Sequence, residues 1–414
     1  MRTGDGGVWS DWELFLTTPG HEDAFGNPYQ TGEADRRWGA GTGVEVSWIP
    51  PFGEFTLGTS LRTDRSEYDR DRTLRRRMVE EELALDAEHT AAGVFVRWRR
   101  TFLDRAGLDF GARLDHLKVR SFNRMGFDGN IVAESANPED PYPISFHVIG
   151  EQGPVGEWVD GSTTVLSPKL GARFGLNDRW SLMASSSRGF RSAVGVLGDP
   201  DRPPVLAWAQ EIGLHYERPG VESHLALFRT DVTNERIQDP ITLEIGSSGS
   251  SVRQGIEVTF AYQLPIGLPP SGRGTVTRAQ LSGQYADAHH DHGDDGSGEP
   301  APEGVEPASG QRVPGIARYL AQLSAAFPLR EGIEGRVEWR VTGPCVPVGE
   351  SGVTTNSFSL LDLGVAFPIR GRFLVDLEVR NVLDKVYPEM RSSGYVNPGA
   401  PRSIGLTVHY VSGN

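Results

Sequence analysis

The sequence predicts an all-β fold, and more narrowly a transmembrane antiparallel up-and-down β-barrel of about 16 strands. Two observations lead to this prediction: apolar residues recur at every second position, and the links between the apolar segments alternate between short and long. Within residues 333–341, Ile333, Val337 and Trp339 alternate with charged side chains, as in a half-buried strand. Because a sheet packed on a soluble core alternates in the same way, this alternation alone leaves a soluble all-β fold open.

The expected strands are the segments with period-two alternation, each bounded by Gly, Pro, Asn, Asp or charged residues that favour turns and loops. They span residues 10–16, 41–49, 54–66, 89–102, 107–120, 164–176, 179–189, 208–217, 222–235, 251–263, 275–288, 315–327, 332–342, 357–367, 372–381 and 402–410.

The links between these strands differ in length according to their parity. Short links are expected at residues 50–53, 103–107, 177–178, 218–220, 328–331 and 368–371, and the link 264–274 has the same parity. Long links are expected at residues 17–40, 67–88, 121–163, 190–207, 236–250, 289–314, 343–356 and 382–401. Short periplasmic turns and long extracellular loops are typical of outer-membrane barrels, whereas a soluble sandwich has no reason to sort its loops by parity.

Residues 76–86 are rich in Glu, Leu and Arg and could form a strand or a helix. A membrane-crossing strand there would move the short link 103–107 to the rim that carries the long loops. We therefore assign the segment to a long loop, as a short helix or as a strand extension above the membrane.

The composition excludes several classes of protein. The formal net charge is −14, from 41 Lys and Arg against 55 Asp and Glu, which argues against nucleic acid as a partner. No run approaches the roughly 18 consecutive apolar residues that a transmembrane helix needs. The 51 glycines are too many for a helical protein and lack the period of collagen. The single cysteine, Cys345, cannot form an intrachain disulfide or a thiolate metal cluster.

Aromatic residues near the strand ends, such as Trp98, Trp180, Phe373 and Tyr410, are typical of the aromatic girdles at the two membrane interfaces. The alternative is the general preference of aromatic residues for strands. The agreement with the loop parity favours the girdles.

Motifs that would indicate an enzyme are weak. Gly39-Ala-Gly-Thr-Gly43 lacks the spacing of a dinucleotide-binding loop and leads into a strand instead of a helix. His289-His-Asp-His292, with Asp294 and Asp295, could bind a divalent cation, but a solvated polar loop explains it better. Ser, His and Asp are too scattered for a catalytic triad. We therefore expect no enzyme, no catalytic residue, no cofactor and no metal site.

Three motifs resemble the TonB-dependent outer-membrane receptor family. Asn381-Val-Leu-Asp-Lys-Val-Tyr387, followed by Pro398-Gly-Ala-Pro-Arg402, is similar to the last hairpin of these receptors. Ser187-Arg-Gly-Phe-Arg-Ser192 resembles a mid-barrel signature, and Gly111-Ala-Arg-Leu-Asp115 resembles the strand that follows a short periplasmic turn. The similarity runs over about residues 94–410.

The resemblance implies a barrel of about 22 strands filled by an N-terminal plug domain. It also implies uptake of a ferric siderophore or a similar scarce nutrient, driven by the TonB complex. No plug-like region, TonB-contacting segment or signal peptide is visible in the sequence. We interpret residues 1–414 as one partial barrel, the C-terminal portion of a larger receptor of the bacterial outer membrane. Its expected partners are outer-membrane lipid and lipopolysaccharide and the nutrient, with the TonB complex only where a plug domain is supplied.

Two other functions remain open at this point. A barrel that stands alone without a plug would be a passive, porin-like outer-membrane channel. A soluble secreted all-β binding protein is the third alternative, although the loop parity and the lack of a repeat of about 40–50 residues argue against it.

Ligand-binding residues are expected in the long loops and on the lumen side near the extracellular rim, because arginines and aromatic side chains suit anionic siderophores. The candidates are Arg188, Phe190 and Arg191, where a strand meets its outer loop, and Tyr387, Arg391 and Tyr395 in the final outer loop. Bracing of the loops by the same side chains is the alternative.

Overall fold

The structure is a computed structural model, which describes residues 2–22, 28–103, 105–125, 156–192, 203–238, 245–266, 275–291, 310–330, 332–347, 353–369, 372–392 and 395–410. In these ranges every regular element is a β-strand. None of the described residues forms a helix long and apolar enough to cross a membrane.

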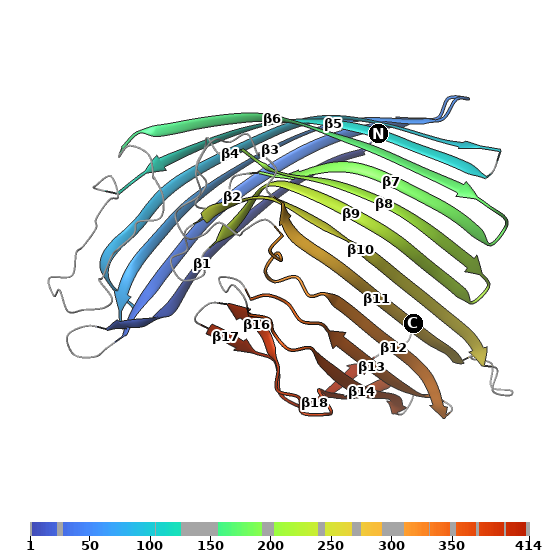
Figure 1. The fold of residues 1–414 in the computed structure, drawn as a ribbon. Coiled ribbons are helices and arrows are strands. Elements are labelled where there is room, and N and C mark those ends of the chain that lie inside the picture. Colours follow the sequence, from blue (N-terminus) through green and yellow to red (C-terminus); the bar gives the residue numbers. More distant parts are fainter. Residues whose placement is uncertain are drawn as a thin grey trace.

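A single sheet of 16 strands, each antiparallel to its neighbours in the sheet, makes up most of the molecule. Its strands are β1 (Arg2–Glu22), β2 (Pro28–Trp48), β3 (Glu54–Leu74), β4 (Arg77–Phe102), β5 (Ala106–Asn123), β6 (Trp158–Gly175), β7 (Trp180–Arg191), β8 (Val205–Arg218), β9 (Val221–Gln238), β10 (Ile245–Ile266), β11 (Thr275–Asp291), β12 (Tyr319–Arg330), β13 (Ile333–Thr342), β14 (Phe358–Ile369), β15 (Phe373–Arg380) and β18 (Ser403–Tyr410). Figure 1 shows the sheet curving around an interior, as in a barrel wall. The predicted up-and-down antiparallel barrel fold is confirmed.

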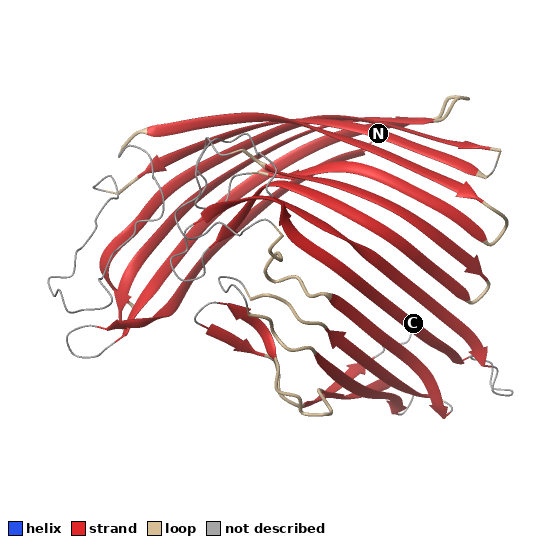
Figure 2. Ribbon diagram, viewed as in Figure 1, coloured by secondary structure: helices blue, strands red, loops and turns tan. Residues whose placement is uncertain are grey.

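The order of the sheet runs from β1 to β18. Within this sheet each described pairing joins strands that are neighbours in this order, and a pairing of β1 with β18 is not among the described ones. Every residue of β18 is exposed. Figure 2 shows turns along one rim, which in this fold is the periplasmic mouth.

Two expected long links are wrong in their extent. Most of the link 17–40 is strand, because β1 continues to Glu22 and β2 begins at Pro28. In the link 67–88, β3 and β4 continue to a tight turn at Arg75 and Arg76, which have φ values of 53° and 61°. The strand-extension interpretation of residues 76–86 is therefore confirmed, and the loop parity is preserved.

The link 382–401 contains a hairpin that the sequence did not predict. Strands β16 (Pro388–Ser392) and β17 (Tyr395–Pro398) form a separate sheet of two strands. Four-residue and five-residue strands carry too little alternation to be recognised in a sequence.

Apolar side chains share one face of the large sheet. Register places Leu323 opposite Trp339 and Trp339 opposite Leu361, so outward-facing side chains continue from strand to strand. Many are exposed, among them Leu61, Ile212 and Trp339. The accessible surface of the chain is 25914 Å², whereas a compact monomer of this mass exposes about 16,000 Å². A single curved sheet exposed on both faces explains the excess, and this argues against a compact soluble fold.

Aromatic side chains gather at the strand ends beside the short turns. Trp48 stacks on Phe55 with ring centroids 5.6 Å apart, and Phe55 lies 6.5 Å from Trp98. Farther along this rim, Trp180 contacts Tyr216 at 4.6 Å. These clusters agree with a girdle at the periplasmic interface. On β2, Trp38 and Trp48 face the same side about ten residues apart, which in a tilted strand matches an apolar band about 25 Å tall.

The motif at residues 381–387 fixes the final loop. The buried side chain of Asn381 donates to the carbonyl oxygens of Lys385 and Ala400, and its Oδ1 accepts from the Lys385 N–H. Asp384 binds the guanidinium of Arg402 at 3.1 Å. The motif that carries the family resemblance therefore joins the end of β15 to the start of β18.

Candidate functional site

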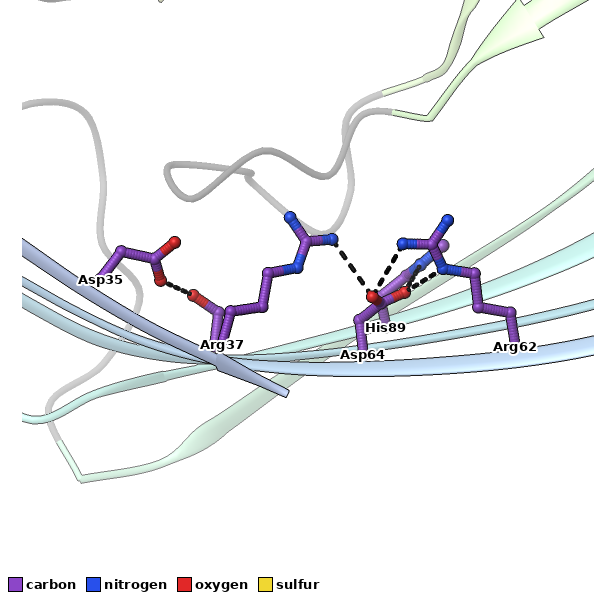
Figure 3. A network of polar contacts seen from close by, with 6 residues as sticks. Asp35, Arg37, Arg62, Asp64 and His89 are labelled. Atoms are coloured by element: carbon purple, nitrogen blue, oxygen red, sulfur yellow. Dashed lines mark hydrogen bonds and ion pairs between the residues drawn. The ribbon is translucent and has the colours of Figure 1, made fainter. Parts of the chain in front are cut away.

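A polar network lies on the lumen face of β2, β3 and β4 near the level of Trp38. Its centre is Asp64, whose side chain is 7% exposed. Asp64 accepts from Arg62 Nε at 2.7 Å and Nη2 at 2.9 Å, and from Arg37 Nη2 at 3.3 Å. His89 Nδ1 lies 3.7 Å from the same carboxylate. Figure 3 shows the two guanidinium groups standing above the sheet on either side of Asp64.

The strand periodicity explains why these side chains meet. Arg62 and Asp64 are two residues apart on β3, so they share a face, and Asp64 lies directly opposite both Gly39 and His89 in the sheet register. A Cβ atom on Gly39 would lie 2.5 Å from Asp64 Oδ1. The glycine at position 39, part of a motif that resembled a nucleotide-binding loop, therefore makes room for the carboxylate.

The arginine side chains of the network are open to the lumen. The exposed fraction is 45% for Arg37 and 63% for Arg62, although both bind the buried Asp64. Two guanidinium groups share the carboxylate of Asp64, so these three side chains together carry one net positive charge, and the nearby Asp35 carboxylate is buried and accepts from Ser66 Oγ. Within the described ranges their remaining N–H donors have no acceptor, so they can form charge-assisted hydrogen bonds with an anion in the lumen.

A second arrangement of the same kind lies on β5. Arg113 and Asp115 are again two residues apart, and Arg113 Nε binds Asp115 at 2.8 Å. Arg113 Nη2 also donates to Ser60 Oγ at 2.8 Å. A Cβ atom on Gly93, opposite Asp115, would lie 2.5 Å from the Asp115 carboxylate. On both β3 and β5, therefore, the aspartate of an Arg-x-Asp pair packs over a glycine of the neighbouring strand.

Above the membrane, the extensions of β3 and β4 are held by a small core. Tyr68, Ala84, Leu85 and Met125 are all buried together. Burial and the nearby Glu33 raise the pKa of Tyr68 above its usual range. Burial also raises the pKa of the Asp86 carboxyl, in spite of the neighbouring Arg124 guanidinium. This packing holds the strand extensions beyond the network in a fixed position.

The first three predicted ligand residues lie at the extracellular end of β7 but not on one face. Arg188 lies opposite Trp208, and the alternation along β7 puts Arg188 and Phe190 on the outward face with Trp180. Arg191 is on the lumen face and is exposed. Of these three residues, Arg191 therefore has the placement that a lumenal ligand requires.

The other three predicted residues belong to the final loop. Tyr387 stacks on Phe358 at 4.7 Å, and its carbonyl oxygen accepts from the Gly399 N–H at 2.9 Å. Arg391 is on β16 opposite Val396, and Tyr395 begins β17. The structure therefore places the six candidates in two separate groups, one at the end of β7 and one in or directly before the β16–β17 hairpin (Figure 1).

Sequence reasoning missed the network around Asp64. Arg37 fell in a segment assigned to a long loop, and Arg62 and Asp64 fell in the strand expected at residues 54–66 without a role of their own. The Arg-x-Asp spacing was an available signal, because the sequence contains it at residues 62–64, 113–115 and 229–231. The register separates the third pair from the other two, since Asp231 lies opposite Trp208 on the outward face.

The histidine-rich segment at residues 289–295, which the sequence favours as a solvated polar loop, is only partly within the described structure. His289 and His290 are the last histidines of β11, whereas His292, Asp294 and Asp295 lie outside the described residues. Among the described residues, no group of three or more His, Cys, Asp or Glu side chains is placed to hold a metal ion.

Comparison with known proteins relates this geometry to solved structures. The chain superimposes on the ferric yersiniabactin uptake receptor FyuA from Yersinia pestis with a TM-score of 0.69 and 16% identity, over 98% of this chain and 56% of that protein. It matches the ferric citrate transporter FecA with a TM-score of 0.71 and 14% identity, over 98% of this chain and 58% of FecA. For the copper transporter OprC the TM-score is 0.69 and the identity 14%, over 99% of this chain and 62% of OprC.

These likenesses show the fold, and the chain spans 56% to 62% of the length of the three proteins. No curated protein matches the chain. The family model described as "TonB dependent receptor-like, beta-barrel" matches residues 4–382. The chain therefore belongs to the TonB-dependent receptor β-barrel family of the bacterial outer membrane, as its motifs predicted.

Proposed function

We propose that this chain is the barrel of a receptor for TonB-dependent uptake of an anionic ferric siderophore or a similar scarce metal chelate. In this proposal residues 1–414 form one barrel domain, and the lumenal cluster of Arg37, Arg62 and Asp64 contacts the chelate. The observation that carries the proposal is the pair of lumen-exposed guanidinium groups that share a single buried carboxylate.

The chemistry of the cluster suits an anion more than a cation. Asp64 is covered by its own arginines and has little surface left for a ligand, whereas Arg37 and Arg62 keep about half of their side-chain surface open. A planar guanidinium binds carboxylate and catecholate-like oxygens in a bidentate way, which gives orientation as well as affinity. Asp64 holds both arginines in place before the ligand arrives, and this lowers the entropy cost of binding.

The related solved structures support the same class of ligand. Their names refer to ferric yersiniabactin, ferric citrate and copper, all of them metals or metal complexes. We propose Arg191, Arg391, Tyr387 and Tyr395 as further contacts at the extracellular mouth, with Arg188 and Phe190 as outward-facing neighbours. Energy coupling through TonB is part of the proposal and needs a plug domain.

Titration with ferric citrate tests the cluster. The full chain is folded in detergent micelles, and binding is followed through the fluorescence of its nine tryptophans. The double variant Arg37→Gln/Arg62→Gln is expected to bind ferric citrate at least about tenfold more weakly, because two charge-assisted hydrogen-bonding groups are lost.

The matched control is Arg278→Gln/Arg340→Gln, which also removes two arginines from the lumen face, on β11 and β13. This control should retain affinity within about twofold, which is a few tenths of a kcal/mol. An equal loss in both double variants would show that ferric citrate responds only to the overall charge of the lumen, and the proposed site would be wrong.

A further inference from the structure

A second concave site lies at the opposite, periplasmic mouth of the barrel. Its cavity has a volume of about 550 Å³ and is formed by the β4–β5 turn, the β6–β7 turn and the end of β8. The lining includes Arg105, Arg173 and Arg179, together with Ser181 and His215. Because Phe174, Trp180 and Tyr216 face outward, the strand alternation turns Arg173, Ser181 and His215 toward the lumen.

The arginines of this cavity differ from the paired arginines of the lumen wall. Within the described part of the chain, the side chains of Arg105, Arg173 and Arg179 have no hydrogen-bond or ion-pair partner. By contrast, several lumenal arginines elsewhere are paired: Arg340 binds Asp362 at 2.8 Å, and Arg336 binds Asp376. Three open guanidinium groups around one cavity are a notable concentration in a chain whose net charge is −14.

A buried hydroxyl gives independent support for a ligand. Ser181 is only 3% exposed and lines the cavity, yet its Oγ has no hydrogen-bond partner among the described residues. Buried hydroxyl groups are normally satisfied, and an unsatisfied one costs stability. The acidic side chains of the cavity are Asp178 and Glu217, of which Glu217 lies 3.7 Å from His215 Nε2. The arginines therefore remain in excess.

We infer that this cavity binds the carboxylate side chains of an acidic polypeptide segment that enters the lumen from the periplasmic side. The three arginines come from separate segments around the cavity, so they can bind several carboxylates of one chain, and the Ser181 hydroxyl can donate to one of them. Arg173, Ser181 and His215 line the cavity from the lumen face of the wall, which favours a polypeptide over a phospholipid. Its volume lies in the range of sites for extended ligands and not of a single inorganic anion. The inference is independent of the metal chelate proposed above.

The test uses the full chain in neutral detergent micelles and a fluorescein-labelled peptide of eight glutamates, with fluorescence anisotropy as the readout. The triple variant Arg105→Gln/Arg173→Gln/Arg179→Gln is expected to bind this peptide at least tenfold more weakly than the unmodified chain. The matched control, Arg218→Gln/Arg330→Gln/Arg372→Gln, removes the same charge from other positions at the same mouth and should stay within twofold. A peptide of eight glutamines should not bind, and raising the salt from 0.05 M to 0.5 M should weaken glutamate binding.

Three results would overturn the inference. Equal losses in the two triple variants would mean that the peptide responds to general charge at the mouth. Complete competition by inorganic phosphate at an ionic strength where chloride has no effect would assign the cavity to a small anion. Displacement of the peptide by phosphatidylglycerol micelles, but not by phosphatidylcholine micelles, would assign it to a lipid headgroup.

Two further measurements separate this inference from the proposed function. The Arg37→Gln/Arg62→Gln variant should keep its affinity for the glutamate peptide, since those arginines lie at the other end of the lumen. The triple cavity variant should keep its affinity for ferric citrate. Circular dichroism shows whether each variant is folded, and the cavity arginines are suitable targets because their side chains stabilise no described contact.

Discussion

Replacing Leu377 by arginine is expected to lower the free energy of unfolding by about 2 to 4 kcal/mol. Leu377 is on the outward face near the middle of β15, and 37% of it is exposed on a face that meets lipid. An arginine at this depth must keep its charge in hydrocarbon or distort the bilayer to reach water. Denaturant titration in phospholipid vesicles, followed by tryptophan fluorescence, gives the difference between the two proteins.

The control for this prediction is Thr407→Arg on the adjacent strand. Thr407 lies opposite Asp376 on the lumen face, one residue from Leu406, which is the register partner of Leu377. An arginine there meets water and the carboxylate of Asp376, so the expected change is below about 1 kcal/mol. Asp376 itself is a poor control, because it accepts a hydrogen bond from Arg336. Equal costs at positions 377 and 407 would contradict the outward and lumenal assignment of the two faces.

Replacing Gly39 by alanine is expected to destabilise the protein by about 1 to 3 kcal/mol, although the added group is a single methyl. The new Cβ would lie 2.5 Å from Asp64 Oδ1, so the carboxylate has to leave its position between Arg62 and Arg37. An ordinary glycine in a strand gains stability on replacement by alanine, so the sign of the change is diagnostic. The measurement is again the free energy of unfolding in vesicles.

Two further variants show whether the clash is the cause. Gly405 is on the lumen face of β18, and a Cβ atom there would have no neighbour within 4 Å, so Gly405→Ala should be neutral or slightly stabilising. The double variant Gly39→Ala/Asp64→Ala should be at least as stable as Asp64→Ala alone, because the obstructing carboxylate is gone. If Gly39→Ala lowers the free energy of unfolding by the same amount with and without the Asp64 side chain, a clash with that carboxylate is not the cause of the destabilisation.

The strand order could be predicted because alternation and loop parity are encoded in the residues themselves. Strands such as β13 and β15, with apolar and charged side chains in strict alternation, match their predicted positions to within about one residue. The extensions of β1 to β4 could not be predicted in the same way. Above the membrane a strand has no lipid to face, so segments such as 30–37 and 67–74 lack the regular apolar alternation of the membrane-spanning part.

The candidate site was harder to predict than the fold, because it depends on which strands lie side by side. Arg62 and Asp64 share a face by periodicity alone, but their approach to Arg37 and His89 follows from the register of β2, β3 and β4. The same is true of Gly39, whose role is visible only once Asp64 is opposite it. Arg188 illustrates a different limit. Its position beside a loop could be predicted, but the face of the sheet on which it lies depends on the phase of the side-chain alternation along β7.

The central claim is that an anionic iron chelate binds beside Arg37 and Arg62, on the β2–β4 part of the lumen wall. Ala91 is a suitable reporter position, because it lies opposite Arg62 on the same face and takes no part in the polar network. Ser282, on the lumen face of β11, is the matched position, seven strand spacings away along the sheet order, or about 30 Å.

The most direct measurement attaches one fluorophore to Ala91→Cys or to Ser282→Cys, each in a Cys345→Ser background, and follows its quenching by ferric citrate. Quenching at position 91 should be strong and should saturate at the same ferric citrate concentrations as the intrinsic tryptophan signal. Quenching at position 282 should be weak. Equal quenching at the two positions, or quenching at position 91 that persists in the Arg37→Gln/Arg62→Gln variant, would contradict the proposed site.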